Sequence, residues 1–178
     1  ALFARLRLVV GQSYTRLLDE LELQPVPVSE VLRKEGGNVF LGAFAALASF
    51  ALFHLVTVFP LSWITLRAEQ SITEVLVVQV AGAALACLAV VVSGWLADRV
   101  GRRQLLGTMA VLIGVFSLAV PWLLDGGELG NNLFLLIGFV LLGLSYGQAS
   151  GTVTANFSPL YRYTGAALST DLAWLIGA

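Results

Sequence analysis

Long apolar runs separated by short polar segments make up most of the sequence. Four of these runs are long enough to cross a hydrocarbon core of roughly 30 Å at about 1.5 Å per residue, and a fifth begins near Thr164. Because lipid offers no hydrogen-bond partners to the backbone, we expect all of the runs to be helices. The predicted spans are residues 39–64, 73–96, 105–124, 132–156 and 164–178, the last of them truncated.

The composition supports a membrane location. Hydrophobic residues make up 58% of the chain, charged residues 12%, and the mean hydropathy is +0.87, which is far more apolar than one soluble core needs. We therefore predict an all-α integral membrane protein, a polytopic bundle of four complete transmembrane helices and a truncated fifth. The sequence begins without Met at Ala1 and stops inside an apolar run, so we expect it to be a fragment.

The segment before the first span has a different character. Residues 1–38 are mixed and charged, and we interpret them as the end of a preceding helix and a cytoplasmic linker with short helical pieces. Ser29 can cap the turn that follows it, and Gly36 and Gly37 can end that turn. Residues 39–178 are the predicted transmembrane bundle.

Charges in the loops alternate between the two predicted sides of the membrane. Basic residues precede the first span and occupy the turns after the second and fourth spans, whereas the opposite segments hold Asp125, Glu128 and, among basic residues, only Arg67. Because arginine and lysine accumulate in cytoplasmic loops, we predict a multi-pass protein of the cell membrane whose basic turns face the cytoplasm. The turn after the second span holds Arg99, Arg102 and Arg103.

Two titratable side chains lie inside the predicted spans. Asp171 follows Thr164 by about seven residues, and an ionised carboxylate facing lipid there would cost several kcal/mol, so it should face protein or water. Proton or substrate binding is one interpretation, and a buried hydrogen bond to a neighbouring helix is the other. His54 is a second candidate because imidazoles titrate near neutral pH, although a single histidine on an apolar helix can simply hydrogen-bond a neighbouring helix.

The fourth span combines small and polar residues. Gly143, Gly147 and Gly151 recur at every fourth position, which lets helices approach closely and predicts a packing face. The polar side chains lie on two sides of this span, and one side should line a central cavity. For the glutamines of the second and fourth spans, a hydrogen bond that bridges helices is an equal alternative to substrate binding. The candidates for substrate contact are Tyr146, Gln148 and Gln79.

Enzyme chemistry has little support in the sequence. We find no nucleophile and base pair, no phosphate-binding glycine loop and no cluster of metal ligands. The single cysteine, Cys87, excludes an internal disulfide and lies far in sequence from His54. We therefore expect no enzymatic activity, no cofactor or metal, and no nucleic-acid partner.

The basic turn carries a family resemblance. GWLADRVGRRQLL, residues 94–106, resembles the signature GxLaDRxGRRxxL of the major facilitator superfamily, which that family places in its cytoplasmic turns. PVSEVLRK before the first span and SPLYRYTGAALSTDLAW at the fifth resemble the metabolite:proton symporter branch. The resemblance covers essentially the whole chain. It implies the carboxy-terminal half of the fold, completed by an amino-terminal half outside this sequence.

The resemblance also implies a conformational latch. Gly94 and Asp98 are one helical turn apart, and in the family the carboxylate meets the start of helix eleven, which stabilises the outward-facing state. A carboxylate at a helix N-terminus gains roughly 0.3 to 1 kcal/mol when exposed. The alternative is that Asp98 only caps a turn and the arginines only set topology. The implied latch residues are Gly94, Asp98, Arg99, Gly101, Arg102, Arg103, Thr164 and Gly165.

The sequence departs from the branch at one position near this turn. Asn156 stands where the branch usually has a glutamate, just before Phe157 and Ser158. We therefore expect that a charged contact from the fourth span to the basic turn is absent.

The function that the resemblance implies is secondary transport. It implies a proton symporter for a small organic acid or zwitterion, which works by alternating access around a midplane site. The partners would be the substrate, protons, the lipid bilayer and the amino-terminal half. An exporter of drugs or metabolites is one alternative, and a non-transporting membrane sensor or scaffold on the same fold is another.

Overall fold

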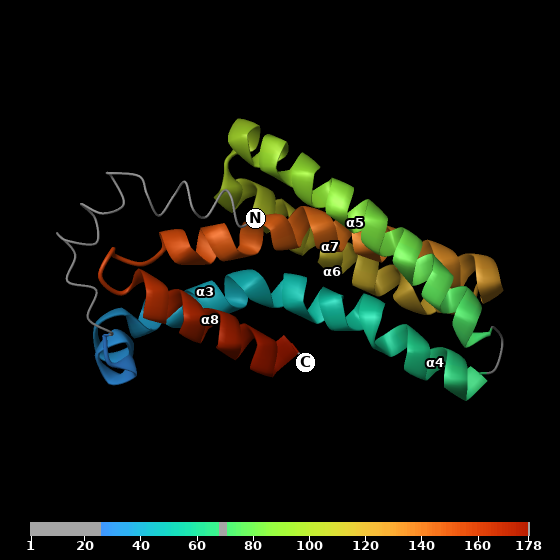
Figure 1. Ribbon diagram of the computed structural model, residues 1–178, viewed down its shortest axis with the longest axis horizontal. Coiled ribbons are helices and arrows are strands. Elements are labelled where there is room, and N and C mark those ends of the chain that lie inside the picture. Colours follow the sequence, from blue (N-terminus) through green and yellow to red (C-terminus); the bar gives the residue numbers. More distant parts are fainter. Residues whose placement is uncertain (1–25, 68–70, 178) are drawn as a thin grey trace, which may run out of the picture.

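The computed structural model describes residues 26–67 and 71–177, and among these residues it contains helices and no strands. The helices lie along one common long direction (Figure 1). Four helical stretches are long and apolar enough to cross a membrane, which confirms the predicted all-α membrane bundle. The helices are α3 (Val28–Thr57), α4 (Phe59–Arg67), α5 (Ile72–Val100), α6 (Arg102–Leu124), α7 (Gly127–Ala155) and α8 (Arg162–Gly177).

α3 differs from the predicted first span at its start. Its N-cap is Pro27, without a side-chain cap, so the predicted cap at Ser29 is wrong. The helix is kinked at Glu35, whose φ of −128° and ψ of 23° are not helical, directly before Gly36 and Gly37, where the turn was expected to end; the helix then continues. Hydropathy predicts only the part of a helix that lies in the hydrocarbon core. α3 begins before that part because its backbone hydrogen bonds start earlier in the chain. The earlier part of the predicted linker, residues 1–25, lies outside the described residues.

The predicted first span is also divided near its end. α3 ends at Thr57, α4 begins at Phe59, and Val58 lies between them. Pro60 in the first turn of α4 has no N–H to donate to the preceding turn, which accounts for the break. α4 therefore forms a short separate helix at the end of the bundle away from the start of α3 (Figure 1).

α7 is the central helix of the bundle. It packs against α3, α5, α6 and α8, whereas α8 packs mainly on α3. One core cluster joins α3, α7 and α8 around Phe50 and Val153, and a second joins α3 to α7 around Val56 and Phe134. The outer faces of α5 and α6 expose many large apolar side chains, as lipid-facing helices do.

The two ends of the bundle carry opposite charges. The start of α3, the α5–α6 turn and the α7–α8 loop share one end, and α4, the start of α5 and the α6–α7 turn share the other (Figure 1). Apart from Arg67 at the end of α4, the described arginines and lysine lie at the first of these ends, which we call the basic end. Glu74, Asp125 and Glu128 lie at the second, the acidic end. The segregation follows the predicted pattern, and the cytoplasmic position of the basic end stays a prediction.

Candidate functional site

The turn between α5 and α6 forms a tight corner of the basic end. Gly101 has φ +88°, a conformation that favours glycine, and its N–H bonds the carbonyl of Ala97 at 2.9 Å. Its own carbonyl accepts from Leu105 N–H at 3.0 Å, so one residue ends α5 and begins α6. The Arg99 guanidinium lies 4.0 Å from the centre of the Trp95 ring, a cation–π contact between two exposed side chains.

The implied latch is not closed within this structure. Asp98 is exposed and makes no hydrogen bond or ion pair with residues 26–67 or 71–177. Among the described residues, no atom lies within 4 Å of a Cβ position built at Gly94, so none of the described helices approaches there. Gly165 contacts the Phe157 ring instead, which a Cβ atom would overlap, and Thr164 is half-buried. The structure therefore does not bring Asp98 to the start of α8, and the latch role stays a prediction.

The other signature arginines lie on the outside of the same corner. The Arg102 guanidinium lies about 3.0 Å from a Cβ position built at Gly151, so α7 meets the basic turn at a glycine. Arg103 is exposed. Asn156 is exposed at the end of α7, and its side chain bonds none of the described residues. α7 thus offers no carboxylate to these arginines within the part of the chain that the structure describes.

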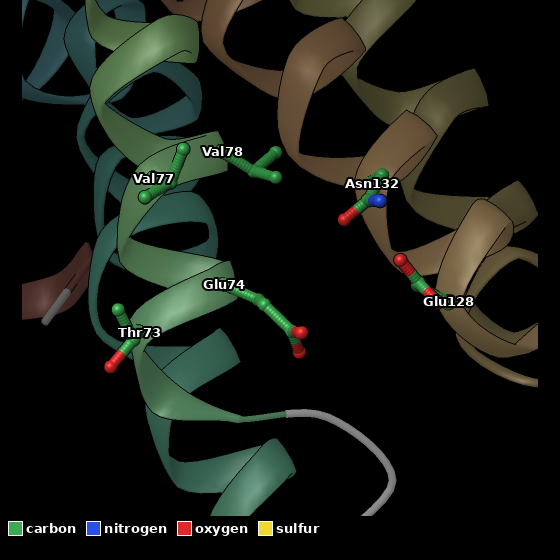
Figure 2. A pocket seen from close by; sticks show the side chains of 6 residues that line it. All are labelled: Thr73, Glu74, Val77, Val78, Glu128 and Asn132. Carbon is green, nitrogen blue, oxygen red and sulfur yellow. The ribbon is translucent and has the colours of Figure 1, made fainter.

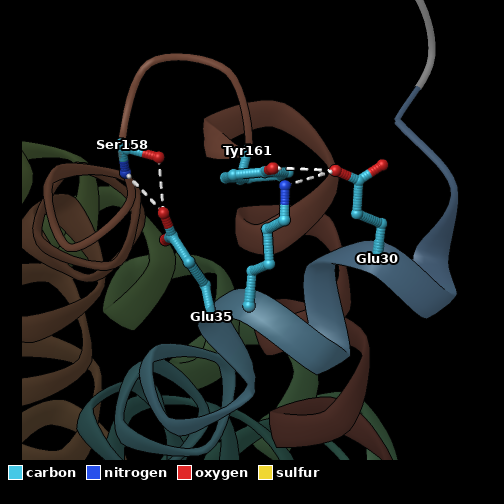
Figure 3. Close-up of polar contacts among 5 residues, drawn as sticks. Glu30, Glu35, Ser158 and Tyr161 are labelled. Atoms are coloured by element: carbon cyan, nitrogen blue, oxygen red, sulfur yellow. Dashed lines mark hydrogen bonds and ion pairs between the residues drawn. The ribbon is translucent and has the colours of Figure 1, made fainter.

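Sequence reasoning missed a set of polar contacts at the basic end (Figure 3). Glu35, at the bend of α3, accepts hydrogen bonds from the hydroxyl and the backbone N–H of Ser158 in the α7–α8 loop. Glu30 accepts from the Tyr161 hydroxyl at 2.9 Å and pairs with Lys34 at 3.0 Å. The partners are 123 and 131 positions apart, so no local pattern could have found them. We call these contacts the α3 tether, because they hold the start of α3 to the α7–α8 loop.

The two glutamine candidates bridge helices. Gln79 of α5 donates from Nε2 to the backbone carbonyls of Val56 and Thr57 at 3.0 and 2.9 Å. Gln148 of α7 is buried and donates from Nε2 to the Ser93 hydroxyl of α5 at 3.1 Å. Both amides therefore make the interhelical hydrogen bonds that were the alternative to substrate binding.

The glycine face of α7 packs as predicted. A Cβ atom at Gly143 would overlap the backbone carbonyl of Ala86, and one at Gly147 would meet the Ser93 hydroxyl. α5 also contributes a glycine to this interface. A Cβ atom at Gly82 would overlap the Phe139 ring of α7. The absence of side chains on both helices lets their backbones approach closely.

His54 belongs to an aromatic cluster formed by α3, α7 and α8. The Trp174 ring centre lies 4.7 Å from Phe50 and 5.1 Å from His54, and Tyr146 meets Phe50 edge-on at 5.6 Å. His54 Nε2 is buried and has no hydrogen-bond partner among the described residues. Tyr146 is 43% exposed, so the cluster reaches the surface of the described bundle. A cavity of about 310 Å³ beside the imidazole is lined by Ala51, His54, Leu55, Val58 and Phe59.

Asp171 lies on the uncovered side of α8. Gly165, Ser169 and Ala173 form the buried side of this helix, and the Ser169 hydroxyl donates to the Val39 carbonyl of α3 at 3.0 Å. Asp171 is exposed on the other side and bonds no residue in 26–67 or 71–177. The interpretation as a hydrogen bond to a neighbouring helix therefore finds no partner in the described structure.

The acidic end contains a separate cavity of about 290 Å³ between α5 and α7 (Figure 2). The carboxylate of Glu74 also caps α5, because it accepts from the Ser71 N–H at 3.1 Å while the Ser71 hydroxyl accepts from the Glu74 N–H. Glu74, which lines this cavity, therefore has a structural role as a helix cap. Among the described residues, no three or more potential metal ligands lie close enough together to hold a metal ion. The cavity is lined by Thr73, Glu74, Val77, Val78, Glu128 and Asn132.

Comparisons with known proteins bear on the whole chain. The sequence model of the Major Facilitator Superfamily matches residues 1–177. The inner membrane metabolite transport protein YhjE of Escherichia coli is 30% identical over 183 residues, which cover 99% of this chain and 42% of that protein. A Haemophilus influenzae protein named for metabolite transport is 28% identical over 192 residues, covering 99% of this chain and 43% of its own length. The chain spans less than half the length of these relatives, and no solved structure matches it significantly.

Proposed function

Because the chain belongs to the major facilitator superfamily, we propose that the intact protein is a secondary transporter of a small metabolite. The relatives named for metabolite transport support this, as does a bundle whose helices are apolar enough to span a membrane. Transport would proceed by alternating access, in which two bundles rock around a site near the midplane. Since this chain spans less than half of its relatives, the substrate site would be shared with residues outside the sequence.

We propose further that transport is symport with protons and that the substrate is a small organic acid or zwitterion. Asp171 carries this proposal. It lies inside the truncated fifth span that the sequence predicts, and it is exposed on α8 without a partner among residues 26–67 and 71–177. An ionised carboxylate facing lipid is costly, so a water-filled or protein-lined path on this side of α8 is the arrangement that accommodates it.

Asp171 can act in two ways on such a path. As a proton site, it would carry the transported proton in one state of the cycle and release it in the other. As a substrate site, it would pair with the cationic part of a zwitterion. His54 is a second titratable group for the same role, because Trp174 contacts its ring from α8, one turn beyond Asp171.

The orientation and the latch belong to the same proposal. We propose that the basic end faces the cytoplasm, since its arginines and lysine outnumber those of the acidic end. The uncovered side of α5 at Gly94 and Asp98 leaves space for a helix to approach. We propose that the latch closes there against a part of the intact protein outside the described residues.

Uptake by reconstituted vesicles tests the function and its direction together. The intact protein would be given radiolabelled carboxylates and betaines under an inward proton gradient, an outward gradient and no gradient. We expect accumulation above equilibrium only with the inward gradient. Accumulation only with the outward gradient would favour an exporter that exchanges substrate for protons, and equilibration that ignores the gradient would contradict proton coupling.

A further inference from the structure

The break between α3 and α4 leaves one backbone carbonyl without its helical donor. In a continuous helix the N–H of residue 60 would bond the carbonyl of Val56, four residues earlier. Pro60 has no N–H, so this bond cannot form. The last bond before the break runs from the Val58 N–H to the His54 carbonyl at 3.0 Å.

The missing bond is replaced from another helix. Gln79, on α5, directs one nitrogen at two carbonyls, those of Val56 and of Thr57, the last residue of α3. An amide nitrogen carries two hydrogens, so both bonds can be made at once. Because this junction lies inside an apolar stretch, water cannot readily replace the amide, and an unsatisfied carbonyl there costs up to several kcal/mol.

α4 depends on this contact more than the longer helices do. It packs on α3 and α5, the helices that the Gln79 amide joins. Ile64 anchors it to the core, with the partly buried Phe59, Leu61 and Trp63 beside it, whereas Leu66 near its end is 84% exposed. The direction of α4 is therefore set by a single anchored face and by the hydrogen bonds at the break.

We propose that Gln79 is a positioning residue for a proline hinge formed by residues 57–60. Its hydrogen bonds fix the orientation of α4 relative to α3 at this hinge. While its amide bonds both carbonyls, α4 stays docked at the start of α5 on the acidic end. When the amide withdraws, α4 is free to tilt about the hinge, because Pro60 prevents a continuous helix from holding it. Neither the family resemblance nor the proposed substrate site requires this role of Gln79. The hinge proposal can therefore fail while the proposed transport function holds, and the reverse is also true.

Local mobility of α4 tests the proposal in the intact protein. A spin label on Leu66→Cys, in a Cys87→Ser background with any further cysteines replaced, would be compared with the same label at Leu118→Cys on α6. We expect Gln79→Leu to mobilise the label on α4 and leave the label on α6 unchanged. Gln148→Leu is the control, because it removes another interhelical amide bond, at a buried position away from the break, and should mobilise neither label.

Replacing Pro60 tests whether the missing backbone N–H is the reason that α4 needs the Gln79 amide. Pro60→Ala restores the N–H that Val56 lacks, so adding it to Gln79→Leu should return the α4 label to wild-type mobility. Should Gln79→Leu fail to fold, Gln79→Asn keeps an amide but is one methylene too short, and the same comparison applies. The proposal is overturned if α4 stays immobile without the Gln79 amide, if Gln148→Leu mobilises it equally, or if Pro60→Ala gives no rescue.

Discussion

The α5–α7 interface and the outer side of α8 treat polar groups in opposite ways. Between α5 and α7, glycines bring the backbones together, and the buried Gln148 amide finds the Ser93 hydroxyl. On α8, Asp171 points away from the packed side and finds no partner among the described residues. A polar side chain that has a hydrogen-bond partner inside the bundle stabilises the packing of the helices. A polar side chain without such a partner is available to bind a ligand.

This contrast separates candidates that the sequence ranked together. Gln79 and Gln148 were plausible substrate contacts, and the structure gives both of them structural partners. Asp171 and Asp98 keep unused carboxylates. Substitutions in the first group should therefore change stability, and substitutions in the second should change transport.

The largest effect on stability is expected at the glycine face. Gly143→Leu would drive a side chain into the Ala86 carbonyl, forcing α7 away from α5 at a cost of about 3 kcal/mol or more. Gly114→Leu is the matched control, because open space surrounds that position on α6. Thermal unfolding in detergent should show a large loss of stability for Gly143→Leu and little loss for Gly114→Leu. Equal losses would mean that helix propensity, and not close approach, governs both glycines.

A smaller effect is expected where the interface is polar. Gln148→Leu should cost about 1 kcal/mol, since interhelical hydrogen bonds in membranes contribute modestly. Combining it with Ser93→Ala should add little, because the two residues share one bond. A double-mutant cycle on unfolding free energies measures the coupling. Fully additive losses would contradict a bond between these side chains.

The α3 tether should contribute less again. Ser158→Ala removes a hydrogen bond to Glu35 at an exposed position, so a loss below about 1 kcal/mol is expected. Tyr161→Phe removes the hydroxyl that Glu30 accepts, with a similar result. Hydrogen exchange should nonetheless report faster opening at the start of α3 in both variants. Unchanged exchange there would show that apolar packing alone holds this segment.

The smallest effect on stability is expected at Asp171. Asp171→Asn is nearly isosteric and breaks no bond in the described structure, so unfolding should shift by no more than about 0.5 kcal/mol. A marked loss of stability would indicate that Asp171 has a structural partner in the intact protein and is not an open carboxylate.

Features that depend on local pattern could be predicted from the sequence. The apolar runs gave the helices, because hydropathy alone dictates which segments enter lipid, and the spacing of Gly143, Gly147 and Gly151 gave a packing face. Gln79 and Glu35 illustrate the limit. Their partners, the Thr57 carbonyl and Ser158, are brought near only by tertiary packing.

Local signals interrupt the helical stretch of α3 and α4 at two positions. Glu35 is kinked directly before Gly36 and Gly37, where the glycine pair was expected to end the turn. Pro60 was visible in the sequence, yet the length of the apolar run favoured a single helix across it. The pairing of Asp98 with Thr164 came from resemblance and not from spacing, and the described structure does not make it.

Substrate-dependent proton movement is the most direct test of the account. The intact protein and its Asp171→Asn variant would be reconstituted into vesicles containing a pH-sensitive dye, and a transported substrate would be added. The account predicts internal acidification by the wild-type protein and none by the variant, which folds with wild-type stability. Acidification that persists in the variant, or wild-type uptake without proton movement, would contradict it.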